Sequence, residues 1–126
     1  MNSFIFFHLN LFFSSIKIND RYLVIKNCYW PILDIIEKNN IPIAVEVSGN
    51  TLLEIKKIDP KWVSKFKELL ELNKTELIGS GFCQIIGPLV PYELNIYNQK
   101  IGLKIYYEIL GVVPKYALVN EMVFSK

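Results

Sequence analysis

Four short apolar runs of the sequence carry polar side chains whose types could do chemistry. The first run holds a histidine and an asparagine, and each of the other three holds one glutamate. Because an unpaired charge inside an apolar run is costly, we interpret these positions as candidate site residues. They are His8, Asn10, Glu46, Glu76 and Glu121. Carboxylates with an imidazole and an amide nearby suit hydroxyl-rich ligands, and a carboxylate pair is the basic tool of glycoside hydrolysis.

The elements that must hold these side chains follow from an alternation along the chain. Helical patterns separate the apolar runs, which is typical of parallel strands in an α/β layer. In such folds ligands and catalytic groups gather at the carboxyl ends of the strands. Alternation along a strand puts His8 and Asn10 on one face, and we expect all the candidate side chains to converge over one rim of the sheet. The runs span residues 4–11, 43–49, 75–79 and 116–121.

Start and stop signals bound the helices between the runs. Asp59-Pro60 predicts a helix start, and Asn50 is expected to cap a short helix before it. Pro31 is expected either to kink a helix or to open a second one. Gly111, with a proline soon after it, predicts the end of the last helix.

Composition narrows the class of protein. The chain has 126 residues, enough for one domain with a core, and its hydrophobic fraction of 52% argues against disorder. The net charge of +2 is small and not clustered, so we expect no nucleic-acid partner. The first apolar run lacks the basic start of a secretory signal, and no stretch is long and uncharged enough to span a bilayer. We therefore expect a cytoplasmic protein without membrane contact.

The two cysteines, Cys28 and Cys83, lack the ligand spacing of a zinc site and fit a reducing compartment. Cys28 falls in a helical stretch and is expected in the core. Cys83 lies in a loop near the candidate site, but a nucleophilic role would need a base that the sequence does not show. We expect no metal and no cofactor.

The sequence contains a series of motifs in order over nearly the whole chain: FHLNL at 7–11, EVSGNTLL at 46–53, TELIGSGF at 75–82 continuing to PLVP at 88–91, and Gln99 with GVVP at 111–114 and VNE at 119–121. Together, and in register, these motifs resemble glycoside hydrolase family 57. Asn10 and Phe12 stand where many members of this family have a second histidine and a proline.

The resemblance implies an α/β fold, part of a (β/α)7 TIM-like barrel with about four parallel strands here, and retaining action on α-glucans or related polysaccharides. It makes Glu121 the catalytic nucleophile. His8, Asn10, Glu46 and Glu76 become substrate-binding residues. A retaining mechanism needs a second carboxyl group about 5–5.5 Å from the nucleophile; in the family this is an aspartate on a later strand, outside these residues.

Length bears on domain organisation, because a closed barrel of this kind takes roughly 200–250 residues. We expect residues 1–126 to be the N-terminal portion of a catalytic barrel, with its open sheet edge covered by the remaining barrel segment or by another chain. On its own the chain is expected to associate and to lack hydrolase activity. Two alternatives stay open: a non-catalytic carbohydrate-binding or subunit-interaction remnant, and a metal-dependent deacetylase of the same broad barrel type.

Overall fold

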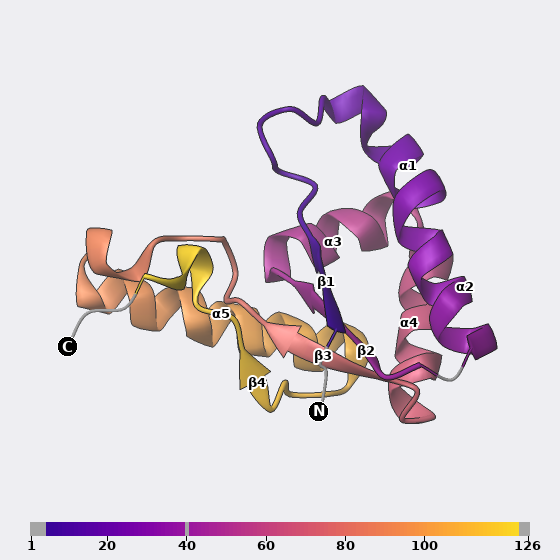
Figure 1. Cartoon of the computed structure of the whole chain (residues 1–126). Coiled ribbons are helices and arrows are strands. Elements are labelled where there is room, and N and C mark those ends of the chain that lie inside the picture. Colours follow the sequence, from indigo (N-terminus) through magenta and orange to yellow (C-terminus); the bar gives the residue numbers. More distant parts are fainter. Residues whose placement is uncertain (1–4, 40, 124–126) are drawn as a thin grey trace.

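The computed structural model describes residues 5–39 and 41–123. They contain a four-stranded sheet in the order β1-β2-β3-β4, in which every neighbouring pair is parallel (Figure 1). The expected parallel strands alternating with helices are thus confirmed. The strands are β1 (Ile5–Leu9), β2 (Ile43–Val47), β3 (Thr75–Gly79) and β4 (Tyr116–Ala117). The helices are α1 (Arg21–Val24), α2 (Trp30–Asn39), α3 (Gly49–Ile58), α4 (Pro60–Glu71) and α5 (Tyr92–Leu110).

Shorter turns complete the path. A π-helical turn, η2 (Ile25–Tyr29), joins α1 to α2, and 3₁₀ turns lie at η1 (Ile18–Asp20), η3 (Gly87–Leu89) and η4 (Asn120–Met122). The last apolar run forms a strand over only two residues before it bends into η4. Within the described residues, no helix is both long enough and apolar enough to cross a membrane.

The core lies between one face of the sheet and the helices. Val45 and Val47 of β2 are fully buried on this face, and they belong to the same apolar cluster as Trp62 and Phe66 of α4. The opposite face carries the candidate residues, because His8 pairs with Glu46 across β1 and β2. In a strand, successive side chains point to opposite faces, so β2 can feed the core and the site at once.

The helix ends show which signals were correctly interpreted. Asp59 caps α4 by accepting a hydrogen bond from the Trp62 backbone N–H at 3.2 Å, as predicted. The prediction that Asn50 caps the preceding helix is wrong. Ser48 is the cap, accepting from the Thr51 backbone N–H at 3.3 Å, because the helix begins directly after β2. Gly111 ends α5 in the left-handed conformation with φ 74°, which costs glycine little.

The expectation that a helix opens at Pro31 agrees with α2 to within one residue, because α2 begins at Trp30. The helical path enters α2 from α1 through η2 without a break. Proline lacks the N–H that would bond the carbonyl four residues earlier, and that carbonyl lies within the wider π turn. The expectation that Cys28 is buried is wrong, since its side chain is exposed. Ile25 and Tyr29 are the buried residues of this turn.

Candidate functional site

The strand register brings His8 of β1 directly beside Glu46 of β2. The Nδ1 atom of His8 is hydrogen-bonded to Oε2 of Glu46. The Glu46 side chain is 0% exposed, whereas that of His8 is 43% exposed. Glu46 therefore lies beneath the histidine and reaches the surface only through it.

Burial dominates the electrostatics of Glu46. It raises the pKa of the Glu46 carboxyl group, while interactions with Ser80 and His8 oppose that rise. The second carboxylate oxygen, Oε1, and the buried Ser80 Oγ each lack a hydrogen-bond partner among the described residues. A buried carboxylate with one unpaired oxygen is costly, and its interactions with Ser80 and His8 offset part of that cost.

Gln84 is a site residue that the sequence did not single out. Its Nε2 atom lies 2.9 Å from Nε2 of His8 and 3.4 Å from Nδ1, so the amide covers one edge of the ring. Its Oε1 accepts a hydrogen bond from Nδ2 of Asn10 at 2.7 Å. The only available signal was position, because Gln84 follows the Gly79-Ser80-Gly81 break at the carboxyl end of β3. Glutamine itself is too common in loops to be diagnostic.

The loop that carries Gln84 is anchored first by helix α3. The backbone N–H groups of Gly49 and Asn50, at the start of α3, donate to the carbonyls of Gly81 and Phe82 at 2.9 and 2.8 Å. The first N–H groups of a helix have no partner within it, so the loop satisfies donors that would otherwise be unpaired. The turn after β2 and the turn after β3 are thereby fixed to each other.

Helix α5 anchors the same loop through a stripe of residues four positions apart, which lie on one helix face. Asn98 accepts from the Cys83 backbone N–H at 2.7 Å and donates to the Cys83 carbonyl at 3.0 Å. Gly102 lies against the Gly81 backbone so closely that an added Cβ would be 2.5 Å from the Gly81 carbonyl carbon. Tyr106 completes the stripe.

The Tyr106 hydroxyl group joins the ends of two strands. It lies 2.6 Å from the Val47 carbonyl and 3.0 Å from the Gly81 carbonyl, and it accepts from the Ser80 backbone N–H at 3.2 Å. Burial raises the pKa of Tyr106 to about 12, so the hydroxyl keeps its proton and acts as a donor at neutral pH. This one side chain holds the carboxyl ends of β2 and β3 in place.

The segment after β1 is held by Arg21. Its guanidinium group lies 4.3 Å from the centre of the Phe12 ring and donates to Oε1 of Glu54 at 2.8 Å. The Phe12 backbone N–H in turn donates to Oδ1 of Asn10 at 2.9 Å. The position of Asn10 beside Gln84 is therefore fixed from both sides.

Glu121 and His8 line one hollow of about 600 Å³ at the carboxyl ends of the strands, together with Gln84. Glu121 lies in η4, which Asn120 ties to the neighbouring loop by donating to the Ile85 carbonyl at 3.1 Å. The backbone of Glu121 has φ 55° and that of Met122 has φ 51°. Non-glycine residues in this left-handed region carry strain, and such strain clusters at functional sites.

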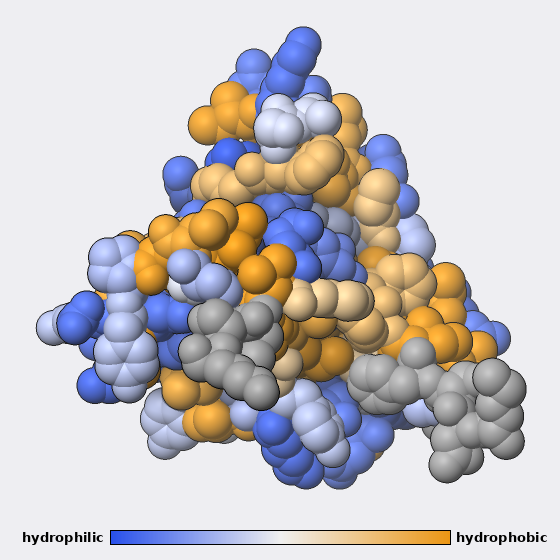
Figure 2. All heavy atoms as spheres, turned by 60° about the vertical axis from the view of Figure 1, so that its left-hand side comes forward, coloured by the Kyte–Doolittle hydropathy of each residue, from blue (hydrophilic) through white to orange (hydrophobic). Residues whose placement is uncertain are grey.

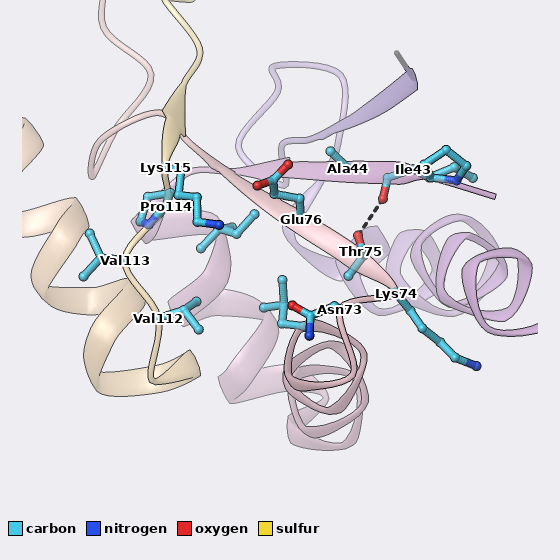
Figure 3. A pocket seen from close by; sticks show the side chains of 13 residues that line it. Ile43, Ala44, Asn73, Lys74, Thr75, Glu76, Val112, Val113, Pro114 and Lys115 are labelled. Atoms are coloured by element: carbon cyan, nitrogen blue, oxygen red, sulfur yellow. Dashed lines mark hydrogen bonds between the residues drawn. The ribbon is translucent and has the colours of Figure 1, made fainter. Parts of the chain in front are cut away.

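Glu76 does not join the other candidates. It is the second residue of β3 and pairs with Ala44, so it lies two positions, or about 7 Å, nearer the amino ends of the strands than Glu46. There it lines a separate pocket of about 420 Å³ with Pro114 and Lys115. Figure 3 shows Glu76 projecting from β3 into this pocket. The expected convergence therefore covers His8, Asn10, Glu46 and Glu121, but not Glu76. The prediction for Glu76 rested on its apolar run alone, without the register of its strand.

Cys83 belongs to the loop that carries Gln84. Burial raises the pKa of the Cys83 thiol, which works against a reactive thiolate. Among residues 5–39 and 41–123, no three histidine, cysteine, aspartate or glutamate side chains group so that they could hold a metal ion.

Comparison with known proteins shows the family and the fold of this chain. A sequence model of glycosyl hydrolase family 57 matches residues 2–126. The chain is 30% identical over 98 residues to alpha-amylase 1 of Dictyoglomus thermophilum, a match that covers 77% of the chain and 14% of that protein. The crystal structure of 4-alpha-glucanotransferase from Thermococcus litoralis superposes with a TM-score of 0.78 at 22% identity, over 96% of this chain and 19% of that one. The α/β barrel-type fold is thus shown, over a small part of the length of either relative, and the chain belongs to glycosyl hydrolase family 57.

Proposed function

We propose that this chain forms the N-terminal portion of the catalytic barrel of a retaining enzyme that acts on α-glucans. The observation that carries the proposal is the hollow at the carboxyl ends of the strands, where Glu121 and His8 lie together above the buried Glu46. The names of the two relatives, an amylase and a glucanotransferase, favour an α-glucan substrate. Parallel barrels place their chemistry at this end of the strands.

In this proposal Glu121 is the nucleophile and forms a glycosyl-enzyme intermediate. Attack of its carboxylate on the anomeric carbon breaks the glycosidic bond, and the leaving oxygen takes a proton from the second carboxyl group. Water or a sugar hydroxyl then releases the glycosyl unit with the same configuration. His8, Asn10 and Gln84 line the approach and bind sugar hydroxyls. The second carboxyl group comes from a segment outside these residues.

The remaining barrel segment, or another chain, covers the open edges of the sheet. β1 and β4 lie at the two ends of the strand order. Ile5 is 47% exposed and Phe7 39% exposed on β1, and Tyr116 is 58% exposed on β4. Figure 2 shows apolar residues over much of one face of the molecule. Large contiguous apolar surface is typical of an interaction site.

The test is turnover of an α-glucan by the completed barrel, meaning this chain together with its covering segment. We expect Glu121→Gln to lower kcat by about 10³-fold or more, because no other group can form the covalent intermediate. Glu71→Gln is the control, since Glu71 is exposed on α4 and its carboxylate pairs with Lys67 at 4.0 Å. Azide added to Glu121→Ala should restore activity and give a glycosyl azide of inverted configuration. Turnover of Glu121→Gln within a few-fold of wild type would refute the role of Glu121 as the nucleophile and leave it a carbohydrate-binding role.

A further inference from the structure

The polar side chains around His8 form one continuous chain of hydrogen bonds with a fixed direction. A backbone N–H can only donate, so the Phe12 N–H requires Asn10 to present its oxygen, at 2.9 Å. Asn10 must then present its amide nitrogen to Gln84, which accepts with Oε1 at 2.7 Å. Gln84 is left with its amide nitrogen facing His8. The Phe12 N–H therefore sets the orientation of both the Asn10 and the Gln84 amide.

The direction continues into the imidazole ring. The shorter contact of Gln84 Nε2, at 2.9 Å, is to Nε2 of His8, where an N–H donor needs a lone pair. At the other side of the ring, Nδ1 meets the buried Glu46 carboxylate, which can only accept when it is ionised. A proton on Nδ1 and a bare Nε2 satisfy both neighbours.

The opposite tautomer of His8 does not fit the neighbouring amide groups. A proton on Nε2 of His8 would require Gln84 to turn its oxygen toward the ring. Its amide nitrogen would then face the amide nitrogen of Asn10 across 2.7 Å, a contact between two donors. If Asn10 turned as well, its nitrogen would face the Phe12 N–H. Each alternative sets two donors against each other, either at the part-buried contact between Asn10 and Gln84 or at the exposed contact between Phe12 and Asn10.

We infer that Asn10 and Gln84 are positioning residues that orient the hydrogen bonds of His8, with its proton on Nδ1 and its Nε2 as a hydrogen-bond acceptor. Glu46 anchors one end of this relay and the Phe12 backbone anchors the other. Glu121, the other carboxylate that lines the hollow, forms no ion pair with His8 among the described residues. Asn10 acts on the imidazole through Gln84, without contacting the ring itself.

The inference gives His8 a defined role toward a ligand, and this part rests on the proposed function. An acceptor at Nε2 takes a hydrogen bond from a ligand hydroxyl group, which replaces the amide of Gln84. The released Gln84 amide nitrogen can then donate to a second hydroxyl oxygen. A vicinal diol, the repeating feature of a sugar, matches this acceptor and donor pair.

The experiment uses ¹⁵N-histidine labelling, because His8 is the only histidine in the sequence and gives one pair of ring nitrogen signals. Magic-angle-spinning NMR of the hydrated 126-residue chain reports protonation of each nitrogen even when the chain associates. We expect Nδ1 to carry a proton and Nε2 to be bare. A proton on Nε2, whether or not Nδ1 also carries one, would overturn the inference.

Substitutions at Gln84 test the contact that sets the acceptor. Gln84→Glu places a carboxylate against Nε2, so we expect both ring nitrogens to become protonated. Gln84→Leu is the matched control, because it keeps the volume but removes the polar contact, and Nε2 should stay bare. An unchanged bare Nε2 in Gln84→Glu would contradict the assignment.

Asn10→Asp tests the relay over a distance. Its carboxylate accepts from both Phe12 and Gln84, so the Gln84 amide must reverse and His8 must gain a proton on Nε2. In the Gln84→Leu background the same substitution should have no effect on the ring. If Asn10→Asp still changes the protonation of the ring in that background, the charge acts through space and the hydrogen-bond relay is refuted. Titration of the completed barrel with maltoheptaose is a separate arm: failure to bind would count against the proposed function while the NMR result on the free chain stands.

Discussion

Removal of the Tyr106 hydroxyl group should destabilise the chain strongly, because this group serves several backbone partners at once. Tyr106→Phe deletes the bonds to the Val47 and Gly81 carbonyls and leaves the Ser80 N–H without its acceptor. The hydroxyl has one proton, so it donates to one carbonyl at a time while it accepts from Ser80. The perturbation is therefore one lost donated bond and one buried N–H left unpaired.

The magnitude follows from those two losses. An unpaired buried donor costs about 1–3 kcal/mol, and a lost hydrogen bond costs about 0.5–1.5 kcal/mol. We expect Tyr106→Phe to lower the free energy of unfolding by roughly 2–4 kcal/mol, toward the upper end of single substitutions. The ring is retained and the residue is only 1% exposed, so the apolar contacts of the side chain change little.

The assay is urea unfolding followed by tryptophan fluorescence, with Tyr107→Phe as the matched control. Tyr107 is the next residue on α5 and is 65% exposed, so loss of its hydroxyl group should change stability by less than about 0.5 kcal/mol. Equal effects of the two substitutions would refute the argument that the Tyr106 hydroxyl joins the strand ends. A changed m-value would instead indicate that the compactness of one state had altered.

Three further predictions follow from burial and close contacts. Burial on folding raises the pKa of Tyr29 and of Tyr106 to about 12. The two tyrosines therefore contribute to stability below the unfolded pKa of about 10, and this contribution is lost as the pH rises from about 10 to about 12. Urea midpoints at pH 9 and 11 should differ less in Tyr106→Phe than in wild type. Gly102→Ala should lower the free energy of unfolding by about 2 kcal/mol or more, since an added Cβ lies 2.5 Å from the Gly81 backbone. This overpacking outweighs the gain in helix propensity of about 1 kcal/mol. A more stable Gly102→Ala chain would show that the loop moves away without cost. The chain alone should sediment as an associated species, and Ile5→Lys on the β1 edge should shift it toward monomer; a wild-type monomer at high concentration would exclude this edge as the cause.

The sequence was most informative where local chemistry decides the structure. Asp59-Pro60 starts a helix because an acceptor side chain and a proline without N–H both suit that position, and the four parallel strands follow from short apolar runs between helical patterns. Strand alternation indicates which face of its strand His8 or Glu46 occupies, but the register that pairs the two residues across β1 and β2 comes only from the structure. Glu76 was misplaced because alternation gives the face of a strand but not its offset along the neighbouring strand, which only long-range pairing sets. Gln84 was missed because its role depends on a loop fixed by α3 and α5.

The fold explains why the site residues can be sparse and still well ordered. His8 comes from an edge strand whose outer neighbour is absent from the described sheet, yet its ring is held from below by Glu46 and from the side by Gln84. Gln84 in turn depends on a loop whose backbone bonds α3 and whose Gly81 contacts α5. The start of α3 and one face of α5, together with Glu46 of β2, therefore order this rim. A covering segment that adds strands to the sheet can complete the barrel without rebuilding the contacts that hold the imidazole.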